Sequence, residues 1–433
     1  MNKNIVLQKA TRIEGNADIH IEFENNQLKS ARFHIYEFRG FEKFVSGKRA
    51  EWVPQMISRI CGLCSVAHQV AGIRAVENAM DIEADANTNK LRDVLVLAEW
   101  ISSHSLSYFF LTVPDFVGEN GGVFELQKNY PDIFKEAFEL RQAAMNSVTL
   151  FGTRETHPVT IGLGHFLPPP GEEELNRGLD IVSVIKEKLR TIILNVSSQW
   201  RLEKAIELPE DLTVNFVALS NGKENDNFFV FDRKGNLVTR FSVDEFEENI
   251  EEMRVDWSLS KIPYINSLGF PDGIMLVGPL SRSFLDNGFL SDPEIRQFGI
   301  SDILKNHANI TLESYDICRL LEMLWSAKKI ESLLKSIGSF APPPEPDWSV
   351  AGQGIGALEA PRGLLIHKYL VKNGIVEKVR LLVATQFNNA FINLLITDLA
   401  QRHSRNGQIT STGSRLIGRC VRLFDPCLSC ATH

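Results

Sequence analysis

Two pairs of cysteines with CxxC spacing, at opposite ends of the chain, constrain its fold more than any other feature. The first pair is Cys61 and Cys64, and the second is Cys427 and Cys430, close to the last residue, His433. Each pair offers two thiol groups to one point, and four thiolates together form a soft site suited to zinc, nickel or iron. If both pairs serve one metal centre, the fold must bring the two ends of a 433-residue chain together.

The simplest alternative interpretations of these pairs are a structural zinc site or a redox-active dithiol. In zinc ribbons the two CxxC pairs lie about 15–20 residues apart, so the spacing here excludes a local zinc module. A zinc clamp between the two chain ends stays open. A thioredoxin-like pair needs a strand–CxxC–helix unit, which the sequence around Cys61 does not show. A disulfide framework does not suit a long chain with only six cysteines.

Composition limits the partners and the compartment. A formal net charge of -8 argues against broad electrostatic binding to nucleic acid. The best apolar run, Val94–Ile101, is broken by Glu99, so we expect no membrane span. The N-terminus lacks the apolar core of a signal peptide, which predicts a cytoplasmic protein.

Periodicity predicts an α-rich α+β fold, in which a central helical bundle carries small antiparallel sheets. We expect one large domain over residues 1–433. Its predicted parts are an N-terminal hairpin (17–38), a helix with the first CxxC pair (55–80), a peripheral β-containing insert (about 211–258), a second hairpin (364–384) and a metal-site end (420–433).

The sequences RICGLC and DPCLSCATH resemble the paired cysteine motifs of the large subunit of nickel–iron hydrogenases. Further segments resemble the family in the same order along nearly the whole chain. They are Thr11–Gly15, Phe38–Phe44, Ser103-His104, Pro114–Phe116, Tyr264–Pro279, Ala360–Gly363 and Ala384–Gln386. The segment Tyr264–Pro279 resembles the soluble, multimeric branch of the family, which is linked to NAD or to heterodisulfide reductase, including electron-bifurcating assemblies.

The resemblance implies a catalytic subunit with the large-subunit fold, which interconverts H2 with protons and electrons. It implies a nickel ion held by four thiolates, with Cys61 and Cys427 as terminal ligands. Cys64 and Cys430 would also bridge to an iron that carries carbon monoxide and two cyanide ligands.

Arg362 is the residue that the resemblance puts over the open face of the metals. It would donate a hydrogen bond to a cyanide or act as a base, but a free arginine is always protonated, so a terminal thiolate such as Cys427 is the better base. The plainer interpretation is a buried ion pair of Arg362 with Asp115 or Asp425, two residues that the resemblance also puts around the cofactor.

Other matched residues would line the centre or serve it. Thr385 would donate to the second cyanide, while Pro361 and Leu365 would pack around the diatomic ligands. His68 would hydrogen-bond a bridging sulfur, although a lone helix histidine is more often structural. His104 has the same two interpretations, and we favour the structural one.

Glu14 would be the first proton relay between a nickel thiolate and solvent, since a positioned carboxyl group can pass protons. Without the resemblance, a salt bridge beside Arg12 would be the favoured interpretation. The family usually has a histidine two residues later, where this chain has Asn16, which cannot relay a proton.

The resemblance also implies a magnesium-type ion below the site, held by Glu42, His433 and the backbone carbonyl of Leu381. A histidine is an unusual ligand for a hard cation. Family precursors extend beyond the final histidine until a maturation protease removes the tail. This chain stops at His433, so we expect it to correspond to the mature form.

Electrons must leave through another chain. The two remaining cysteines, Cys318 and Cys420, cannot hold a four-cysteine cluster and are predicted to be buried thiols. The resemblance implies an iron–sulfur small subunit, with flavin-containing diaphorase-type or heterodisulfide-reductase-type partners. The glycine-rich segment 352–356 lacks a strand–turn–helix setting, so we interpret it as a loop and expect no dinucleotide site here.

Three other functions stay open at this point. A hydrogen-sensing regulatory protein would use the same ligands. A non-catalytic relative would have lost the metal cysteines, so retention of all four weighs against it. A protein with a structural zinc clamp would contain zinc without nickel and iron.

Overall fold

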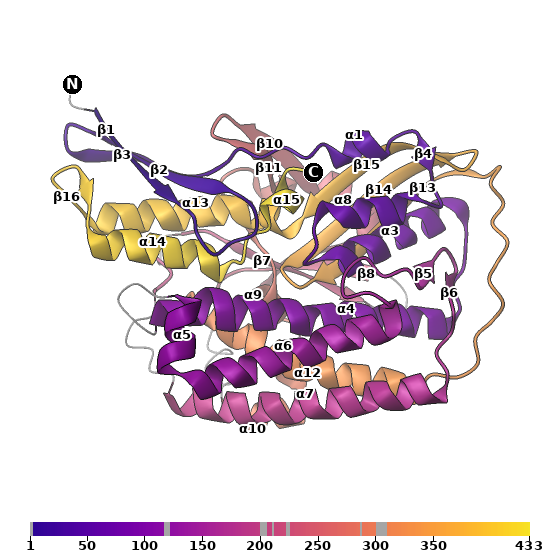
Figure 1. Cartoon of the computed structure of the whole chain (residues 1–433). Coiled ribbons are helices and arrows are strands. Elements are labelled where there is room, and N and C mark those ends of the chain that lie inside the picture. The colour runs from indigo at the N-terminus through magenta and orange to yellow at the C-terminus, as the bar shows by residue number, and fades with distance from the viewer. Residues whose placement is uncertain are drawn as a thin grey trace.

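Four long helices form the lower layer of the molecule in the view of Figure 1. A computed structural model describes residues 3–116, 122–199, 206–209, 212–221, 226–285, 288–299 and 310–433. In it, α4 packs against α6 and α12, and α7 packs against α6 and α12. These helices are α4 (Ala86–Leu106), α6 (Pro131–Gly152), α7 (Glu172–Gln199) and α12 (Ser314–Lys335). This is the predicted helical bundle.

Local sequence explains where two of these helices begin. Asp85 caps α4, because its side chain accepts hydrogen bonds from the backbone N–H groups of Asn87 and Thr88. The first turn of α7 carries three glutamates, which interact favourably with the positive end of a helix dipole. Among the described residues, one helical stretch, 86–116, is long and apolar enough to cross a membrane. Within its most apolar window 78% is buried in the protein, as expected for a core helix.

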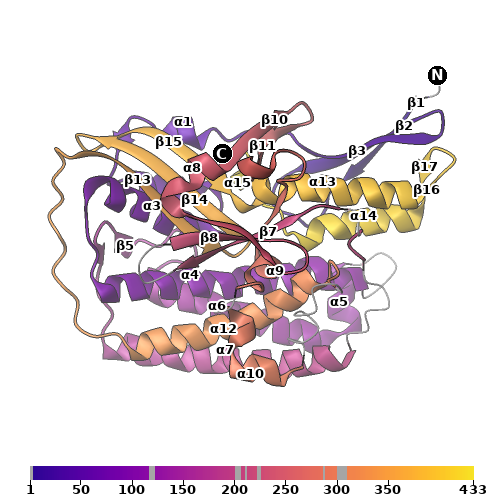
Figure 2. The ribbon, with the colours of Figure 1, turned by 180° about the vertical axis from the view of Figure 1, so that it is seen from behind.

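A four-stranded sheet dominates the upper layer. Its strand order is β13-β14-β15-β4, and its long strands β13, β14 and β15 lie beside α3 and α13 in Figures 1 and 2. The bounds are β4 (Lys48–Arg49), β13 (Ala351–Ala360), β14 (Gly363–Lys372), β15 (Ile375–Val383), α3 (Ser65–Met80) and α13 (Ala384–Arg402). Strands β14 and β15 pair as an antiparallel hairpin, with its turn at Asn373-Gly374, where both φ angles are positive.

The glycine-rich segment 352–356 lies inside β13, so the expected loop is wrong. Helix α3 crosses this strand so closely that a Cβ atom on Gly352, Gly354 or Gly356 would lie 2.1, 2.2 or 2.0 Å from a carbonyl oxygen of α3. Alternating glycines on one face of the strand therefore give the helix room to approach. They have a packing function that a loop interpretation missed.

A second antiparallel hairpin lies near the N-terminus. It consists of β2 (Ala17–Glu24) and β3 (Gln27–Ile35) around the turn Asn25-Asn26, and β1 (Lys3–Lys9) adds a third strand beside β2. The inward side chains of β2 and β3 alternate with half-buried ones, and β3 packs on α13. This contact joins the N-terminal sheet to the C-terminal half of the chain.

The helix expected over residues 55–80 is interrupted at the first cysteine pair. The chain forms α2 (Val53–Ile57) and a 3-10 turn η1 (Ser58–Ile60), and it becomes helical again only at α3. Cys61 has extended backbone angles and Cys64 is the N-cap of α3. The pair therefore lies in a short loop, where both thiols can face the same side.

The middle segment carries strands that share a core with the second hairpin. Its sheet has the order β12-β7-β8-β9, and a separate pair joins β10 to β11. Val217 and Phe228 are buried in one cluster with Leu364 and Ile366 of β14, so the described part of the segment is not peripheral. Of the predicted insert, residues 211 and 222–225 lie outside the described residues. The strands are β7 (Asn215–Asn221), β8 (Asp226–Phe231), β9 (Leu237–Ser242), β10 (Ile250–Val255), β11 (Ser258–Ile265) and β12 (Met275–Leu276).

The C-terminal end returns to the interior of the molecule. Residues 420–432 are buried, and the C-terminus lies near the middle of the upper layer in Figures 1 and 2. The other described elements are short or belong to this end. They are α1 (Phe41–Val45), η2 (Ser107–Thr112), η3 (Val113–Phe116), α5 (Val123–Asn129), β5 (Ile161–Gly162), β6 (His165–Phe166), η5 (Val243–Glu245), α8 (Phe246–Asn249), η6 (Asn266–Leu268), α9 (Pro279–Arg282), η7 (Phe289–Ser291), α10 (Pro293–Gln297), β16 (Ser404–Arg405), β17 (Gln408–Ile409), α14 (Ser411–Leu423) and α15 (Leu428–Ala431).

Candidate metal centre

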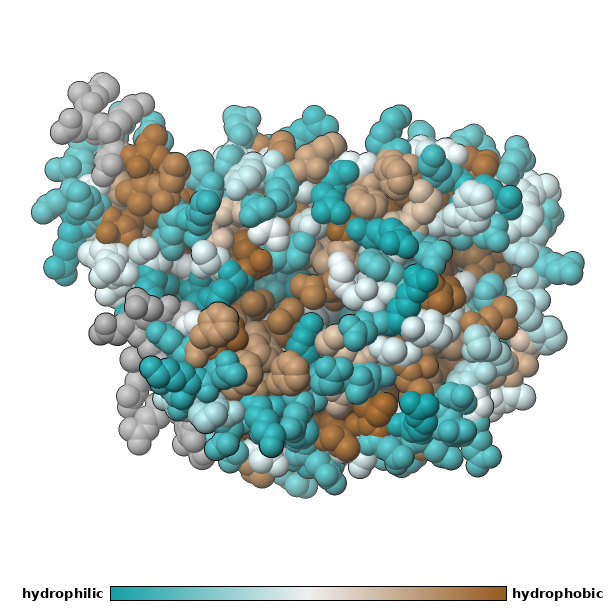
Figure 3. All heavy atoms as spheres, viewed as in Figure 1, coloured by the Kyte–Doolittle hydropathy of each residue, from teal (hydrophilic) through white to brown (hydrophobic). Residues whose placement is uncertain are grey.

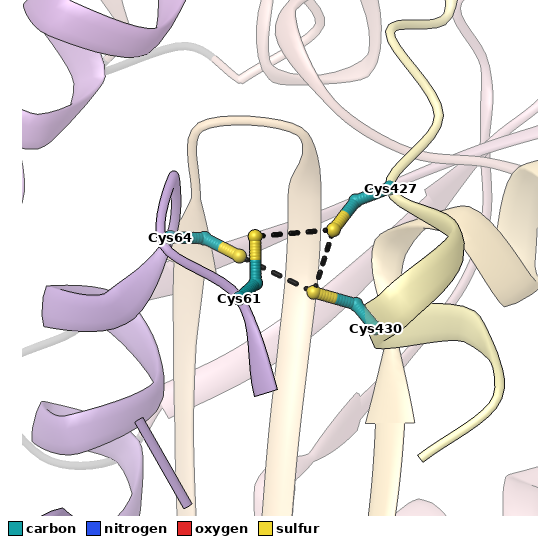
Figure 4. A group of neighbouring side chains, drawn as sticks. All are labelled: Cys61, Cys64, Cys427 and Cys430. Carbon is teal, nitrogen blue, oxygen red and sulfur yellow. Dashed lines mark hydrogen bonds between the residues drawn. The ribbon is translucent and has the colours of Figure 1, made fainter. Parts of the chain in front are cut away.

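The four cysteines of the two CxxC pairs meet in one buried group. Their sulfur atoms all lie within 4.8 Å of one another. Figure 4 shows the side chains of the two pairs pointing toward one another from opposite sides. The Sγ of Cys427 lies 3.2 Å from that of Cys61 and 2.8 Å from that of Cys430, and the Sγ atoms of Cys64 and Cys430 are 3.3 Å apart. The fold thus brings both ends of the chain to a single point.

Helix α4 fixes the loop with the first pair. The buried Glu99 of α4 accepts hydrogen bonds from the backbone N–H groups of Val66 and Ala67, at 2.8 and 3.0 Å. It thereby satisfies donors at the start of α3 that have no partner within the helix. Burial raises the pKa of Glu99 to about 8, although these two hydrogen bonds lower it. The carboxyl group holds the helix end directly behind Cys61 and Cys64.

The N-terminal strand region and α13 hold the second pair. The backbone carbonyl of Glu14 accepts from the N–H of Leu428 at 3.2 Å. The hydroxyl oxygen of Thr385, at the start of α13, accepts from the N–H of Cys427 at 2.9 Å. Asp425 has a positive φ of 47°, which turns the chain into the motif. These contacts fix the backbone on both sides of Cys427.

A small cavity of about 20 Å³ adjoins the sulfur atoms. Arg362, Thr385 and His68 are polar residues of its lining, and Leu365 is one of its apolar walls. The Nη1 atom of Arg362 is buried and has no hydrogen-bond partner among the described residues. Thr385 accepts from Cys427, so its hydroxyl hydrogen remains to donate. The cavity therefore combines apolar walls with two polar groups able to donate into it. Its full lining is Cys64, His68, Ala360, Arg362, Leu364, Leu365, Val383, Ala384, Thr385, Cys427 and Cys430.

The four buried thiols need a nearby cation if they are all deprotonated. Hydrogen bonds from the other three thiols lower the pKa of Cys61 well below its ordinary value, whereas burial raises the pKa values of Cys427 and Cys430. Four thiolates cannot share one dry site unless positive charge balances them. Soft sulfur donors, close spacing and burial fit a nickel and iron centre held by these four side chains.

Arg362 is paired with Asp425, one of its two expected partners. Its Nη2 lies 3.0 Å from the Asp425 carboxylate, and its Nε donates to the Asp425 carbonyl at 2.7 Å. Burial lowers the pKa of Arg362, but Asp425 and the nearby thiols raise it well above its ordinary value. The guanidinium therefore stays protonated and acts as a hydrogen-bond donor.

Asp115, by contrast, is placed with two other arginines. It pairs with Arg12 and accepts from Arg422 at 2.8 and 2.9 Å. Asp115 therefore connects Arg12 of the N-terminal segment to Arg422 of α14, the helix that precedes the second cysteine pair in the chain. Pro361 is absent from the cavity lining within the described residues, and its carbonyl accepts from Arg282 at 3.1 Å.

Two histidines of the sequence analysis have different surroundings. His68 lies with its Nε2 atom 3.4 Å from the sulfur of Cys430. Burial lowers the pKa of His68 to about 4. His104 lies in the helical bundle, where its Nε2 is 3.1 Å from Glu322, and burial lowers its pKa to about 4 despite that contact. The structural interpretation of His104 agrees with this position.

The side chain of Glu14 contacts the second cysteine motif. Its two carboxylate oxygens accept from the backbone N–H of Ser429 at 3.0 Å and from the Ser429 hydroxyl at 2.5 Å. Asn16, the residue that departs from the family, donates to Glu37 at 2.7 Å on the surface. Glu14 is thus half-buried between the thiol group and the outside.

His433 and Glu42 meet at the C-terminal end. The Nδ1 of His433 lies 2.7 Å from the carbonyl oxygen of Cys430, and its Nε2 lies 3.6 Å from Glu42. Leu381 contributes its N–H group, which donates to Glu42 at 2.8 Å. Cys318 and Cys420 are buried away from this centre, and burial raises the pKa of each.

Sequence reasoning missed three residues that support the site. They are Glu99 behind the first pair, Ser429 beside Glu14, and His367, whose Nε2 lies 3.1 Å from the Nδ1 of His68. The signal for His367 was present, because alternation along 364–384 turns every second side chain inward. Which partner each would meet depends on the packing of α3 on the sheet.

The fold and the buried group of four thiols define a metal-binding protein of the hydrogenase class. The chain matches the family model described as nickel-dependent hydrogenase over residues 39–123 and 261–433, and a HoxL-like model over residues 4–38. The chain belongs to the nickel-dependent hydrogenase family.

Similar proteins cover the whole chain. One relative, from the F420-non-reducing hydrogenase of Methanothermobacter thermautotrophicus, is 31% identical, over 99% of this chain and 94% of the relative. The HoxS subunit beta of the NAD-reducing hydrogenase of Cupriavidus necator is 27% identical, over 100% and 95%. The crystal structure of an NAD+-reducing NiFe-hydrogenase in the H2-reduced state matches with a TM-score of 0.87 at 25% identity, over 100% of both chains.

These similarities confirm the predicted fold and reaction. The Ni-Fe-Se hydrogenase of Desulfovibrio vulgaris shares the fold with a TM-score of 0.77 at 22% identity. The chain is the catalytic subunit of a nickel–iron hydrogenase, an oxidoreductase that acts on H2. Its relatives are single subunits of larger enzymes, which implies a partner subunit for this chain.

Proposed function

We propose that Cys61, Cys64, Cys427 and Cys430 hold a nickel–iron centre at which this chain oxidises H2 and reduces protons reversibly. The observation that carries the proposal is the convergence of four buried sulfurs within 4.8 Å beside a cavity lined by Arg362, whose Nη1 has no partner in the described part of the chain. When bound, the centre supplies the redox chemistry that splits H2 into protons and electrons. The protein holds the metals, excludes water, and moves protons and electrons away.

We propose different ligand roles for the four cysteines around this cavity. Cys64, Cys427 and Cys430 line it, whereas Cys61 does not. We assign Cys64 and Cys430, the second cysteine of each pair, as the ligands that would also bind an iron on the cavity side, and Cys61 and Cys427 as terminal nickel ligands. A carbon monoxide and two cyanides on the iron fit a recess with apolar walls and few donors.

Arg362 and Thr385 are the donors for those ligands. The Nη1 of Arg362, which no described residue contacts by a hydrogen bond, and the hydroxyl hydrogen of Thr385 can each donate toward the cavity. Leu365 supplies apolar wall, and Pro361 stiffens the turn between β13 and β14. Because Asp425 keeps the guanidinium charged, we assign Arg362 to hydrogen bonding and leave the base to a terminal thiolate such as that of Cys427.

Glu14 is the proposed first proton acceptor outside the thiol group. Its carboxylate contacts Ser429, which lies between Cys427 and Cys430 in the chain. A carboxyl group held at this position can exchange a proton with a neighbouring sulfur on one side and with solvent-side groups on the other. Asp115 is proposed to act at a distance, by fixing Arg422 of α14.

A magnesium-type cation is proposed between Glu42 and His433. The Nδ1 of His433 donates to the Cys430 carbonyl, so it carries a hydrogen. In the neutral tautomer with this hydrogen, Nε2 has a lone pair and no hydrogen, and that lone pair lies on the side of Glu42. Two acceptors then face each other at 3.6 Å, and a cation between them removes the conflict. The backbone of Leu381, which already binds Glu42 through its N–H, lies beside this place.

The proposed partners are a small subunit with iron–sulfur clusters and, beyond it, flavin-containing diaphorase-type or heterodisulfide-reductase-type proteins. Apolar side chains are exposed over β1 and α5 in Figure 3, and Phe124 of α5 is 84% exposed. Exposed aromatic groups of this kind support contact with another chain. The named relatives support NAD(P) or a non-F420 carrier as the electron acceptor. We place the enzyme in the cytoplasm, with a maturation protease acting on its precursor.

Metal analysis and infrared spectroscopy of the purified hydrogenase test the proposal together. We expect nickel and iron in equal amounts on this chain, and infrared bands from carbon monoxide and cyanide. Zinc without nickel would show that the four cysteines form a structural zinc clamp and would refute the nickel–iron centre. Nickel without the diatomic bands would support the four cysteines as nickel ligands and would refute the iron that carries carbon monoxide and cyanide.

A further inference from the structure

A chain of three hydrogen-bonding side chains runs from the sulfur of Cys430 into the core. The Nε2 of His68 lies 3.4 Å from that sulfur, and the Nδ1 of His68 lies 3.1 Å from the Nε2 of His367. The Nδ1 of His367 in turn lies 2.8 Å from the hydroxyl of Tyr369. The three side chains are at most 1% exposed, so water does not compete for these contacts.

The chain is formed where α3 packs on β14. His68 lies on α3, one turn after Cys64, and His367 and Tyr369 both point inward because they are two residues apart on β14. Gly72 of α3 lies over the tyrosine, since a Cβ atom there would be 3.1 Å from the hydroxyl. The register of helix on strand therefore sets the order of the three groups.

The donors in this chain can be assigned from its two ends. A sulfur that binds a metal is a thiolate and accepts, so the Nε2 of His68 must donate to Cys430. The Nδ1 of His68 then accepts from the Nε2 of His367, because a neutral imidazole has one donor and one acceptor nitrogen. The Nδ1 of His367 accepts in turn, and the Tyr369 hydroxyl supplies the hydrogen.

The opposite direction has no consistent assignment. It would require Cys430 to donate a hydrogen to His68, which a metal-bound thiolate does not carry. It would also turn the Tyr369 hydroxyl hydrogen away from His367, where no second partner is found among the described residues. All hydrogen bonds of the chain therefore point toward the sulfur.

We propose that His367 and Tyr369 are positioning residues for the nickel–iron centre: they lock the tautomer of His68 so that it always donates a hydrogen bond to the Cys430 sulfur. This inference rests on the proposed function of Cys430 as a metal ligand. A hydrogen bond to a metal-bound sulfur withdraws electron density from it and raises the reduction potential of the centre. Tyr369 therefore influences the reduction potential of the centre without contacting the metals.

The test is Tyr369→Phe in the complete, purified hydrogenase, read by infrared spectroscopy. The change removes one hydroxyl and keeps the ring. Without that donor, the Nδ1 of His367 loses its hydrogen-bond partner, so His367 and then His68 become weaker donors and the hydrogen bond to the sulfur weakens. A more electron-rich sulfur increases donation to the iron, so we expect the carbon monoxide band to move to lower frequency. The midpoint potential should fall, with nickel and iron content unchanged.

Tyr264→Phe is the matched control, because it removes a tyrosine hydroxyl that binds Glu251 on the surface. Its bands should not move. His367→Gln keeps a donor toward His68 and an acceptor toward Tyr369, so we expect bands close to those of the unchanged enzyme. His367→Leu keeps neither, and should shift the bands as Tyr369→Phe does.

The outcomes separate this inference from the proposed function. Bands present in the unchanged enzyme but unmoved in both Tyr369→Phe and His367→Leu would overturn the positioning role and leave the metal centre intact. Absence of the bands in the unchanged enzyme would instead remove the proposed iron ligands. If His367→Leu fails to take up metal, Tyr369→Phe and His367→Gln decide the matter.

Discussion

The close approach of α3 to β13 should make Gly354→Ala strongly damaging to the metal centre, although the residue touches no metal ligand. A Cβ atom on Gly354 would lie 2.2 Å from the carbonyl oxygen of Ala75, and ordinary contact begins at 3.4 Å, so helix and strand must separate by about 1.2 Å. The obstructing atoms are backbone on both sides. No side chain can rotate to relieve the contact.

The size of the effect follows from that displacement. Overpacking a core costs about 1–3 kcal/mol, and we expect the upper end because backbone must move. Cys64 is the N-cap of helix α3, and metal–ligand distances tolerate shifts of only about 0.2 Å. If about 3 kcal/mol is taken from metal binding, nickel affinity falls roughly a hundredfold. The same strain should lower the temperature of thermal unfolding.

Nickel content per chain, measured after purification under identical conditions, is the assay. Gly338→Ala is the matched control, because its Cβ would lie 3.7 Å from the nearest atom, the Asn87 side chain. That variant should retain its nickel and unfold at an unchanged or slightly higher temperature. Full nickel occupancy in Gly354→Ala, with unchanged unfolding, would refute the packing argument.

Three further predictions concern single groups. Cys427→Ser should lose nickel and H2 turnover while its far-ultraviolet circular dichroism stays unchanged, and normal turnover would remove Cys427 from the ligand set. Glu14→Gln should slow deuterium exchange between D2 and solvent protons with nickel still bound, whereas exchange at the ordinary rate would point to another relay. Acidification from pH 6.5 to 4 should destabilise the protein by about 3 kcal/mol through His104, because its folded pKa is about 4 and the unfolded chain binds the proton first. In His104→Gln that part of the pH dependence should vanish from denaturant titrations, and an identical slope would contradict the assignment.

The helical and hairpin elements were predictable because their signals are local. The turns at Asn25-Asn26 and Asn373-Gly374 fall where residues that tolerate positive φ interrupt two alternating runs. The break at Cys61–Cys64 escaped prediction, since an apolar, helix-compatible sequence continues on both sides of it. Contact with Glu99 of α4 favours the break, by satisfying the N–H groups of the new helix start.

The glycines of β13 show the same limit. Alternating glycines read locally as a flexible segment, because each lacks a side chain that could pack. Because these glycines lack a Cβ atom, the backbone of α3 can approach β13 more closely than it could with any other residue type there. A single sequence carries no record of which helix will lie there.

The sequence by itself determined the chemistry of this protein: four cysteines in two pairs, the residues around them, and therefore the class of metal that they can hold. The tertiary structure decided the geometry. It chose Asp425 over Asp115 as the partner of Arg362, left one guanidinium nitrogen free beside the sulfurs, and aligned His68 with His367 and Tyr369. Donor types belong to individual residues and can be read from them, whereas hydrogen-bond direction and distance arise only when segments far apart in the chain pack together.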